Sequence, residues 1–222
     1  MSKAYFLIVL FLITACGEKS KEDSVDFLEP QPSEIKNSET FNKKYQGNYI
    51  DPNDSSQLLI LPNKLIKTVY LRGVCLRNDL DSSFKGDKNN NDDVIASLKK
   101  DNIDVAYIDG DSIHFVWNIK DTLFSISPTN IAKYYKGSYF LNYTNDQLTW
   151  KVQRMDLSKK RLSIGVIMPN DSLFTVIHIE NISEVKNDTG LVTNYKMKPS
   201  KKELKRLIKR DAFIESEIWI KK

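Results

Sequence analysis

A five-residue pattern recurs along the chain and limits how its strands can be arranged. Tyr45-Gln46-Gly47-Asn48-Tyr49 is matched 90 residues later by Tyr135-Lys136-Gly137-Ser138-Tyr139, and Asp121-Thr122-Leu123-Phe124 is matched 50 residues later by Asp171-Ser172-Leu173-Phe174. Each half therefore opens on a Tyr-x-Gly-x-Tyr strand and closes on a strand that begins with Asp and then Thr or Ser. Two copies are too few for a solenoid. The pattern predicts a duplicated antiparallel β-meander, and chance convergence of short strands is the alternative.

Alternation of apolar and polar side chains predicts the strands themselves. The alternating apolar positions are Ile113, Phe115 and Trp117, then Leu148, Trp150 and Val152, then Leu162, Ile164 and Val166. In a strand such positions share one face, which is expected to be buried. Asp109-Gly110 lies between two apolar runs and predicts a tight hairpin turn. A sheet with this many short strands normally forms a barrel or a sandwich, so we expect a mainly β fold of one of these types.

Two helices are expected to accompany the strands. Residues 92–100 carry an apolar stripe at helical spacing, which predicts a short inserted helix. Ser200 and Glu203 have the spacing of a capping box, which predicts a C-terminal helix to about Arg210, followed by a last strand over residues 212–220. The lysines and arginines of this helix either form a solvated face or contact an anionic glycolipid or membrane.

The N-terminal segment has the composition of an export signal. Lys3 precedes an apolar run from Ala4 to Ile13, and Thr14-Ala15-Cys16 follows. The run is shorter than the roughly 20 apolar residues that a transmembrane helix needs. Residues 1–15 are therefore interpreted as a cleaved signal peptide. The alternative is an ordinary secretory signal in which Cys16 is incidental.

Residues around the expected cleavage point resemble a known class of anchored proteins. Ile13-Thr14-Ala15-Cys16 resembles the lipobox of bacterial lipoproteins, and Lys21-Glu22-Asp23 resembles the Lys-acid-acid tag of Bacteroidetes-type outer-membrane lipoproteins. The resemblance implies that the Cys16 thiol carries a diacylglycerol, with acyl chains such as palmitate. The protein would then be a lipid-anchored partner of the outer membrane, either exposed at the cell surface or on the periplasmic face.

Two further short likenesses belong to the same comparison. Asp23-Ser24-Val25 resembles the O-glycosylation acceptor of the Bacteroidetes, which makes Ser24 a candidate for modification. Gly47-Asn48-Tyr49 faintly resembles the opening motif of the lipocalin barrel, with Tyr in place of Trp.

The chain is expected to contain a tether and one folded domain. Residues 16–42 are polar, include Pro30 and Pro32 and show no apolar period, which predicts a lipidated disordered tether. The rest is predicted to be a single β-rich domain over residues 43–222, with halves at about 43–130 and 131–198 and the C-terminal helix and strand at 199–222.

The sequence contains none of the common motifs for catalysis, metal binding or nucleotide binding. There is no Gly-x-Ser-x-Gly, no His-Glu-x-x-His, no P-loop and no dinucleotide fingerprint, so no catalytic residue and no cofactor are expected. Once Cys16 is lipidated, Cys75 has no second thiol with which to form an intramolecular disulfide. It is expected to be a small buried side chain that packs like an aliphatic residue. His114 and His178 are expected in strands, as exposed or hydrogen-bonded residues.

One polar loop superficially resembles a calcium site. Its side-chain oxygens would come from Asp87, Asn89, Asn91 and Asp93. Asp92 stands where the loop needs Gly for its sharp turn, and Leu98 stands where it needs a bidentate Glu. A solvated loop is therefore favoured, and no metal is expected.

Net charge argues against one class of partner, nucleic acids, and leaves several functions open. The formal net charge is +4, which becomes +3 without Lys3 of the signal, and this is too mild to imply a nucleic-acid partner. We expect a non-catalytic binding or interaction module of the cell envelope that takes an apolar ligand, a glycan or a protein partner. The alternatives are a cell-envelope hydrolase that uses acidic residues and a structural accessory of an outer-membrane complex. Enzyme activity stays open.

Overall fold

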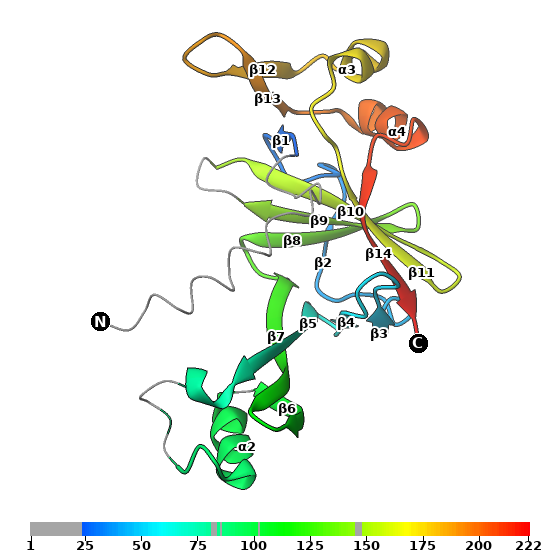
Figure 1. Ribbon diagram of the computed structural model, residues 1–222. Helices are drawn as coiled ribbons and strands as arrows, with labels where there is room; N and C mark the ends of the chain where they lie inside the picture. Colours follow the sequence, from blue (N-terminus) through cyan, green and yellow to red (C-terminus); the bar gives the residue numbers. More distant parts are fainter. Residues whose placement is uncertain (1–23, 81–83, 85, 102, 145–147) are drawn as a thin grey trace. The chain divides into compact units, whose positions relative to one another are not determined.

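The computed structural model describes residues 24–80, 84, 86–101, 103–144 and 148–222 (Figure 1). Within these residues the chain is mainly β, with 14 strands in one hydrogen-bonded sheet that does not close on itself. The predicted mainly β fold, with a short inserted helix and a C-terminal helix, is confirmed. The chain divides into two compact units. Of the described residues, unit 1 contains those within 24–39 and 126–218, and unit 2 contains those within 40–125 and 219–222.

Unit 1 is built around the strand β10 (Trp150–Ser158). On one side β10 pairs with β9 (Ser138–Thr144), and on the other it pairs with β11 (Arg161–Val166) and with the two-residue β1 (Asp26–Phe27). The remaining elements of this unit are β2 (Asn37–Ser38), β8 (Asn130–Tyr135), α3 (Asp171–Ile177), β12 (Ile182–Lys186), β13 (Val192–Met197), α4 (Lys201–Lys209) and the first residues of β14 (Ile214–Lys221).

The short strand β1 joins two parts of the sheet of unit 1. Asp26 and Phe27 pair antiparallel with β10 and parallel with β13, so the β12–β13 hairpin meets the rest of the sheet through β1. Val25 and Phe27 are fully buried and belong to the main apolar cluster of this unit. The predicted disordered tether is therefore wrong for residues 24–42. Val25 and Phe27 dock the start of this polar segment, and so few apolar residues produce no periodic pattern in the sequence.

Buried polar side chains hold the loop that follows β1. The Lys133 ammonium donates hydrogen bonds to the carbonyls of Pro30 (3.1 Å) and Pro32 (2.8 Å). The Asn142 amide accepts from the Gln31 N–H (2.6 Å) and donates to the Gln31 carbonyl (2.9 Å). Burial lowers the pKa of Lys133. Both prolines of the predicted tether thus lie in a loop with defined hydrogen-bond partners.

The helix α4 begins at the predicted capping box. The Ser200 N–H donates to the Glu203 carboxylate (2.7 Å), and the Glu203 N–H donates to the Ser200 hydroxyl (3.4 Å). Leu204 and Leu207 join the same cluster as Phe27, which also contains Phe140 and Phe213 in an edge-to-face pair 5.7 Å apart. Burial of these large side chains is the main favourable contribution to the stability of this unit.

Unit 2 contains a long antiparallel ladder. β5 (Lys64–Leu76) and β7 (Ser112–Ser125) pair along nearly their full lengths. The other elements are β3 (Gly47–Ile50), β4 (Gln57–Ile60), a 3₁₀ turn η2 (Arg77–Asp79), α2 (Asn91–Lys100), β6 (Ile103–Asp109) and the last residues of β14. The predicted hairpin turn is confirmed between Asp109 and Ser112, and Gly110 in it has a φ of 54°.

The two copies of the repeat share only part of their structure. Gly47 and Gly137 both have positive φ, and Tyr49 and Tyr139 after them are buried strand residues. The second pattern behaves differently, since residues 121–124 lie in β7 while residues 171–174 begin α3. The strand predicted at Asp171-Ser172-Leu173-Phe174 is therefore wrong. None of the helices in the described ranges has the length and apolar character needed to cross a bilayer.

Candidate functional site

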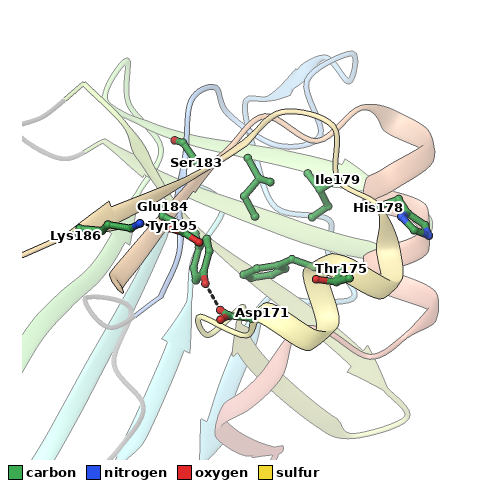
Figure 2. A pocket seen from close by; sticks show the side chains of 10 residues that line it. Asp171, Thr175, His178, Ile179, Ser183, Glu184, Lys186 and Tyr195 are labelled. Atoms are coloured by element: carbon green, nitrogen blue, oxygen red, sulfur yellow. Dashed lines mark hydrogen bonds and ion pairs between the residues drawn. The ribbon is translucent and has the colours of Figure 1, made fainter. Parts of the chain in front are cut away.

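An open cleft of about 920 Å³ lies in unit 1 between α3 and the β12–β13 hairpin (Figure 2). One wall is formed by α3 and the residues that follow it. The other is formed by β12 and by Tyr195 of β13. The lining residues are Asp171, Phe174, Thr175, His178, Ile179, Ile182, Ser183, Glu184, Lys186 and Tyr195.

The local sequence explains why a helix forms the first wall. The Asn170 side chain accepts the Leu173 N–H (2.9 Å), so Asn170 is the N-cap, and Asp171 in the first turn suits the positive end of the helix dipole. Phe174 and Ile177 are buried one turn apart. His178 ends the helix in the left-handed conformation with a φ of 53°, and not in the strand predicted for it.

The base of the cleft is an aromatic pair with one hydrogen bond to a carboxylate. Tyr195 is buried, its ring meets Phe174 edge-on at 5.0 Å, and its hydroxyl donates to the Asp171 carboxylate. Figure 2 shows this hydroxyl pointing out of the hairpin toward α3. The contact links the hairpin to the start of the helix. It also holds the Asp171 carboxylate at the cleft with part of its hydrogen-bonding capacity still available.

Charged side chains lie at the rim. Glu184 is paired with Tyr195 in the β12–β13 register, and its carboxylate forms an exposed ion pair with Lys186 at 2.8 Å. The hydrogen bond to Glu184 raises the pKa of Lys186. In Figure 2, His178 and Lys186 lie at opposite ends of the cleft. The rim thus offers acceptors and a donor around an apolar base.

The cleft combines apolar and polar groups in one concave surface. The Asp171 carboxylate accepts the Tyr195 hydroxyl, and the Glu184 carboxylate is paired with Lys186. Small-molecule sites typically have an apolar wall and a few polar groups that orient the ligand, and the lining of this cleft contains both.

Of the two predicted modification sites, only Ser24 lies within the described residues. Cys16 lies outside the described residues, and its lipidation stays a prediction. Ser24 is only 1% exposed, and its carbonyl accepts hydrogen bonds from Lys151 (2.5 Å) and Asn194 (3.3 Å). A glycan on Ser24 would have to be attached before this segment folds.

Three of the four side chains of the calcium-like loop accept hydrogen bonds from the protein itself. The Asn91 side chain accepts from Arg77, Asp87 accepts the Asn89 N–H (2.9 Å) and Asp93 accepts the Asp87 N–H (2.9 Å). Across the described part of the chain, no group of three or more His, Cys, Asp and Glu side chains is placed to hold a metal ion.

Cys75 and His114 lie in unit 2, in the β5–β6–β7 region. Burial raises the pKa of Cys75, and the nearby Asp79 raises it further, so thiolate formation is disfavoured. The His114 ring stacks on Tyr107 at 4.0 Å. Neither arrangement is that of an activated nucleophile and its base.

Sequence reasoning missed the cleft because it assigned residues 171–176 to a strand. Asn170 directly before Asp-Ser is a helix N-cap signal, and it outweighs the likeness of these residues to the strand at 121–124. No known protein family, no characterised protein and no solved structure matches the chain.

Proposed function

We propose that the protein is a lipid-anchored component of the cell envelope that binds a ligand without catalysis, and that the cleft between α3 and the β12–β13 hairpin is its binding site. The observation that carries the proposal is the lining of this cleft. Phe174, Ile179 and Ile182 provide apolar surface, and Asp171 and Glu184 provide hydrogen-bond acceptors beside it. A compound with an apolar body and hydroxyl or amine groups fits this chemistry.

The anchor is the second part of the proposal. It is supported by the apolar run and by the lipobox-like residues that end at Cys16. A single acyl chain gives marginal membrane binding, whereas the two or three chains of a lipoprotein anchor give stable attachment. The outer membrane is the location that the Lys-acid-acid tag suggests.

A pair of neighbouring residues on α3 allows a controlled test. Thr175 lines the cleft, whereas Val176 is next to it in sequence, is 57% exposed and does not line the cleft. Thr175→Trp would fill the cleft, and Val176→Trp would add the same bulk to the outer surface of the same helix.

The readout is mass spectrometry of small molecules that co-purify with the lipidated protein from its membrane. We expect a compound that is retained by the wild type and by Val176→Trp and is lost from Thr175→Trp. Equal retention by the two variants, or no retained compound in the wild type, contradicts the proposal.

A further inference from the structure

We propose that the outer face of α4 binds the anionic lipid headgroups of the membrane that carries the anchor. This basic face consists of Lys202, Lys205, Arg206, Lys209 and Arg210. It lies entirely within unit 1 and is distinct from the cleft.

The helix separates apolar and basic residues onto opposite sides. Leu204 and Leu207 are fully buried in the core of unit 1, whereas Lys202, Lys205 and Lys209 are exposed. Because successive residues turn by about 100°, the basic residues spaced by three and four positions form one stripe along the helix. The stripe presents its charges to a single flat surface.

The basic face keeps its charges available, unlike the lysines that flank it. Lys198 pairs with Glu29 and Lys201 pairs with Glu34, each at 3.0 Å. Among the ion pairs of the described residues, none uses Lys202, Lys205, Lys209 or Arg210. Arg206 is the exception, because it is only partly exposed: its Nε is buried without a hydrogen-bond partner, and its charge acts on the neighbouring Glu203 carboxylate.

The path of the chain keeps this face near the proposed anchor. β1 pairs with the end of β13, at Lys196 and Met197, and β13 leads directly into α4. Only residues 17–23 separate Cys16 from the first described residue, Ser24. Seven residues span at most about 25 Å when fully extended. This step rests on the proposed lipidation, whereas the charge of the face does not.

The expected strength follows from simple electrostatics. A Lys or Arg close to an anionic surface contributes enough to change membrane partitioning about fivefold. The attraction falls off over a Debye length of about 10 Å at moderate salt, so the helix has to lie on the surface for it to act. Acyl chains together with a basic surface form the two-part membrane attachment that holds peripheral proteins stably.

The test uses residues 16–222 with Cys16→Ser, so that the anchor contributes nothing. Sedimentation with vesicles of phosphatidylglycerol and phosphatidylcholine is compared with sedimentation with phosphatidylcholine alone. The test variant is Lys202→Gln, Lys205→Gln and Lys209→Gln together. The control is Lys43→Gln, Lys120→Gln and Lys160→Gln together, which changes net charge equally at exposed lysines elsewhere. Circular dichroism verifies that each protein is folded.

We expect salt-sensitive binding to the anionic vesicles only, weakened roughly a hundredfold in the α4 variant and only slightly in the control. The inference is overturned if the α4 variant binds anionic vesicles as well as the wild type does, or if both variants lose the same amount of binding. It is also overturned if the wild type binds neutral vesicles as well as anionic ones. If the wild type binds no anionic vesicle, the face has another role, such as contact with an acidic protein, and the lipid assignment is wrong. Thr175→Trp should bind vesicles normally, so failure of the cleft proposal and failure of this one are distinguishable.

Discussion

Asp26 and Lys151 form a buried ion pair that ties the two-residue strand β1 to the central strand of unit 1. Their charged atoms are 3.1 Å apart, and each side chain is only 9% exposed. The Lys151 ammonium also donates to the Ser24 carbonyl at 2.5 Å. Since β1 joins β10 to the β12–β13 hairpin, this pair lies at the connection between the core and one wall of the cleft.

Removing one partner of this pair is expected to be costly. Asp26→Ala leaves the Lys151 charge buried, which should lower the free energy of unfolding by about 3–5 kcal/mol. The matched control is Glu34→Ala, which breaks the single-contact Lys201–Glu34 pair at 3.0 Å, with side chains 41% and 63% exposed, and should cost less than about 1 kcal/mol. Urea unfolding measures both. Equal losses would show that β1 contributes no more than a surface contact.

A second prediction concerns Gly73 in β5. The Phe115 ring of β7 covers it so closely that an added Cβ would lie 2.5 Å from the ring. Gly73→Ala should therefore push the ring away and destabilise the protein by about 1–3 kcal/mol. Adding Phe115→Leu should recover part of the loss, because the smaller side chain leaves room. Thermal unfolding compares the variants, and a neutral Gly73→Ala contradicts the described packing.

A third prediction uses the acid at the start of α4. Burial alone would raise the pKa of Glu203, but hydrogen bonds from Ser200 and from the Glu180 N–H, together with Arg206, bring it below the ordinary value of 4.5. A lowered folded-state pKa stabilises the protein fully above the unfolded pKa, and this contribution disappears as pH falls through the folded pKa. Above about pH 5, Glu203→Gln should reduce stability by roughly 1.5–3 kcal/mol.

The difference between the wild type and Glu203→Gln should shrink as the pH drops below about 4. Urea unfolding across this range checks it, with the exposed Glu184→Gln as the control. A difference that stays constant down to low pH would mean that the carboxylate is not the group that stabilises the helix start.

A fourth prediction separates the two cysteines. Cys16→Ser should abolish incorporation of labelled palmitate in cells and move the protein from the membrane fraction to the soluble fraction. Cys75→Ser is the matched control, since it removes the only other thiol, and labelling should be unchanged. Labelling that survives Cys16→Ser would show that Cys16 is not the site of lipidation.

The sequence predicted the parts of the fold that local patterns determine. The Ser200–Glu203 capping box, the helix near residues 92–100 and the turn after Asp109 depend on neighbouring residues and are confirmed. The strand β1 was missed because its burial depends on partners more than 120 residues away. The likeness of Asp-Ser-Leu-Phe to the strand at 121–124 predicts a strand over residues 171–176, but the N-cap at Asn170 begins a helix there.

The cleft could not be predicted for the same reason. Its walls come from a helix that was taken for a strand and from a hairpin whose register brings Glu184 beside Tyr195. Neither residue stands out in the sequence. The contacts of Tyr195 with Phe174 and with the Asp171 carboxylate show that the two walls meet.

The most direct test of ligand binding is an experimental structure of the lipidated protein purified gently from its own membrane. We expect non-protein density in the cleft, in contact with Phe174 or Ile182 and within hydrogen-bond distance of the Asp171 carboxylate. A cleft filled only with solvent, with a bound compound located elsewhere on the protein, would contradict it.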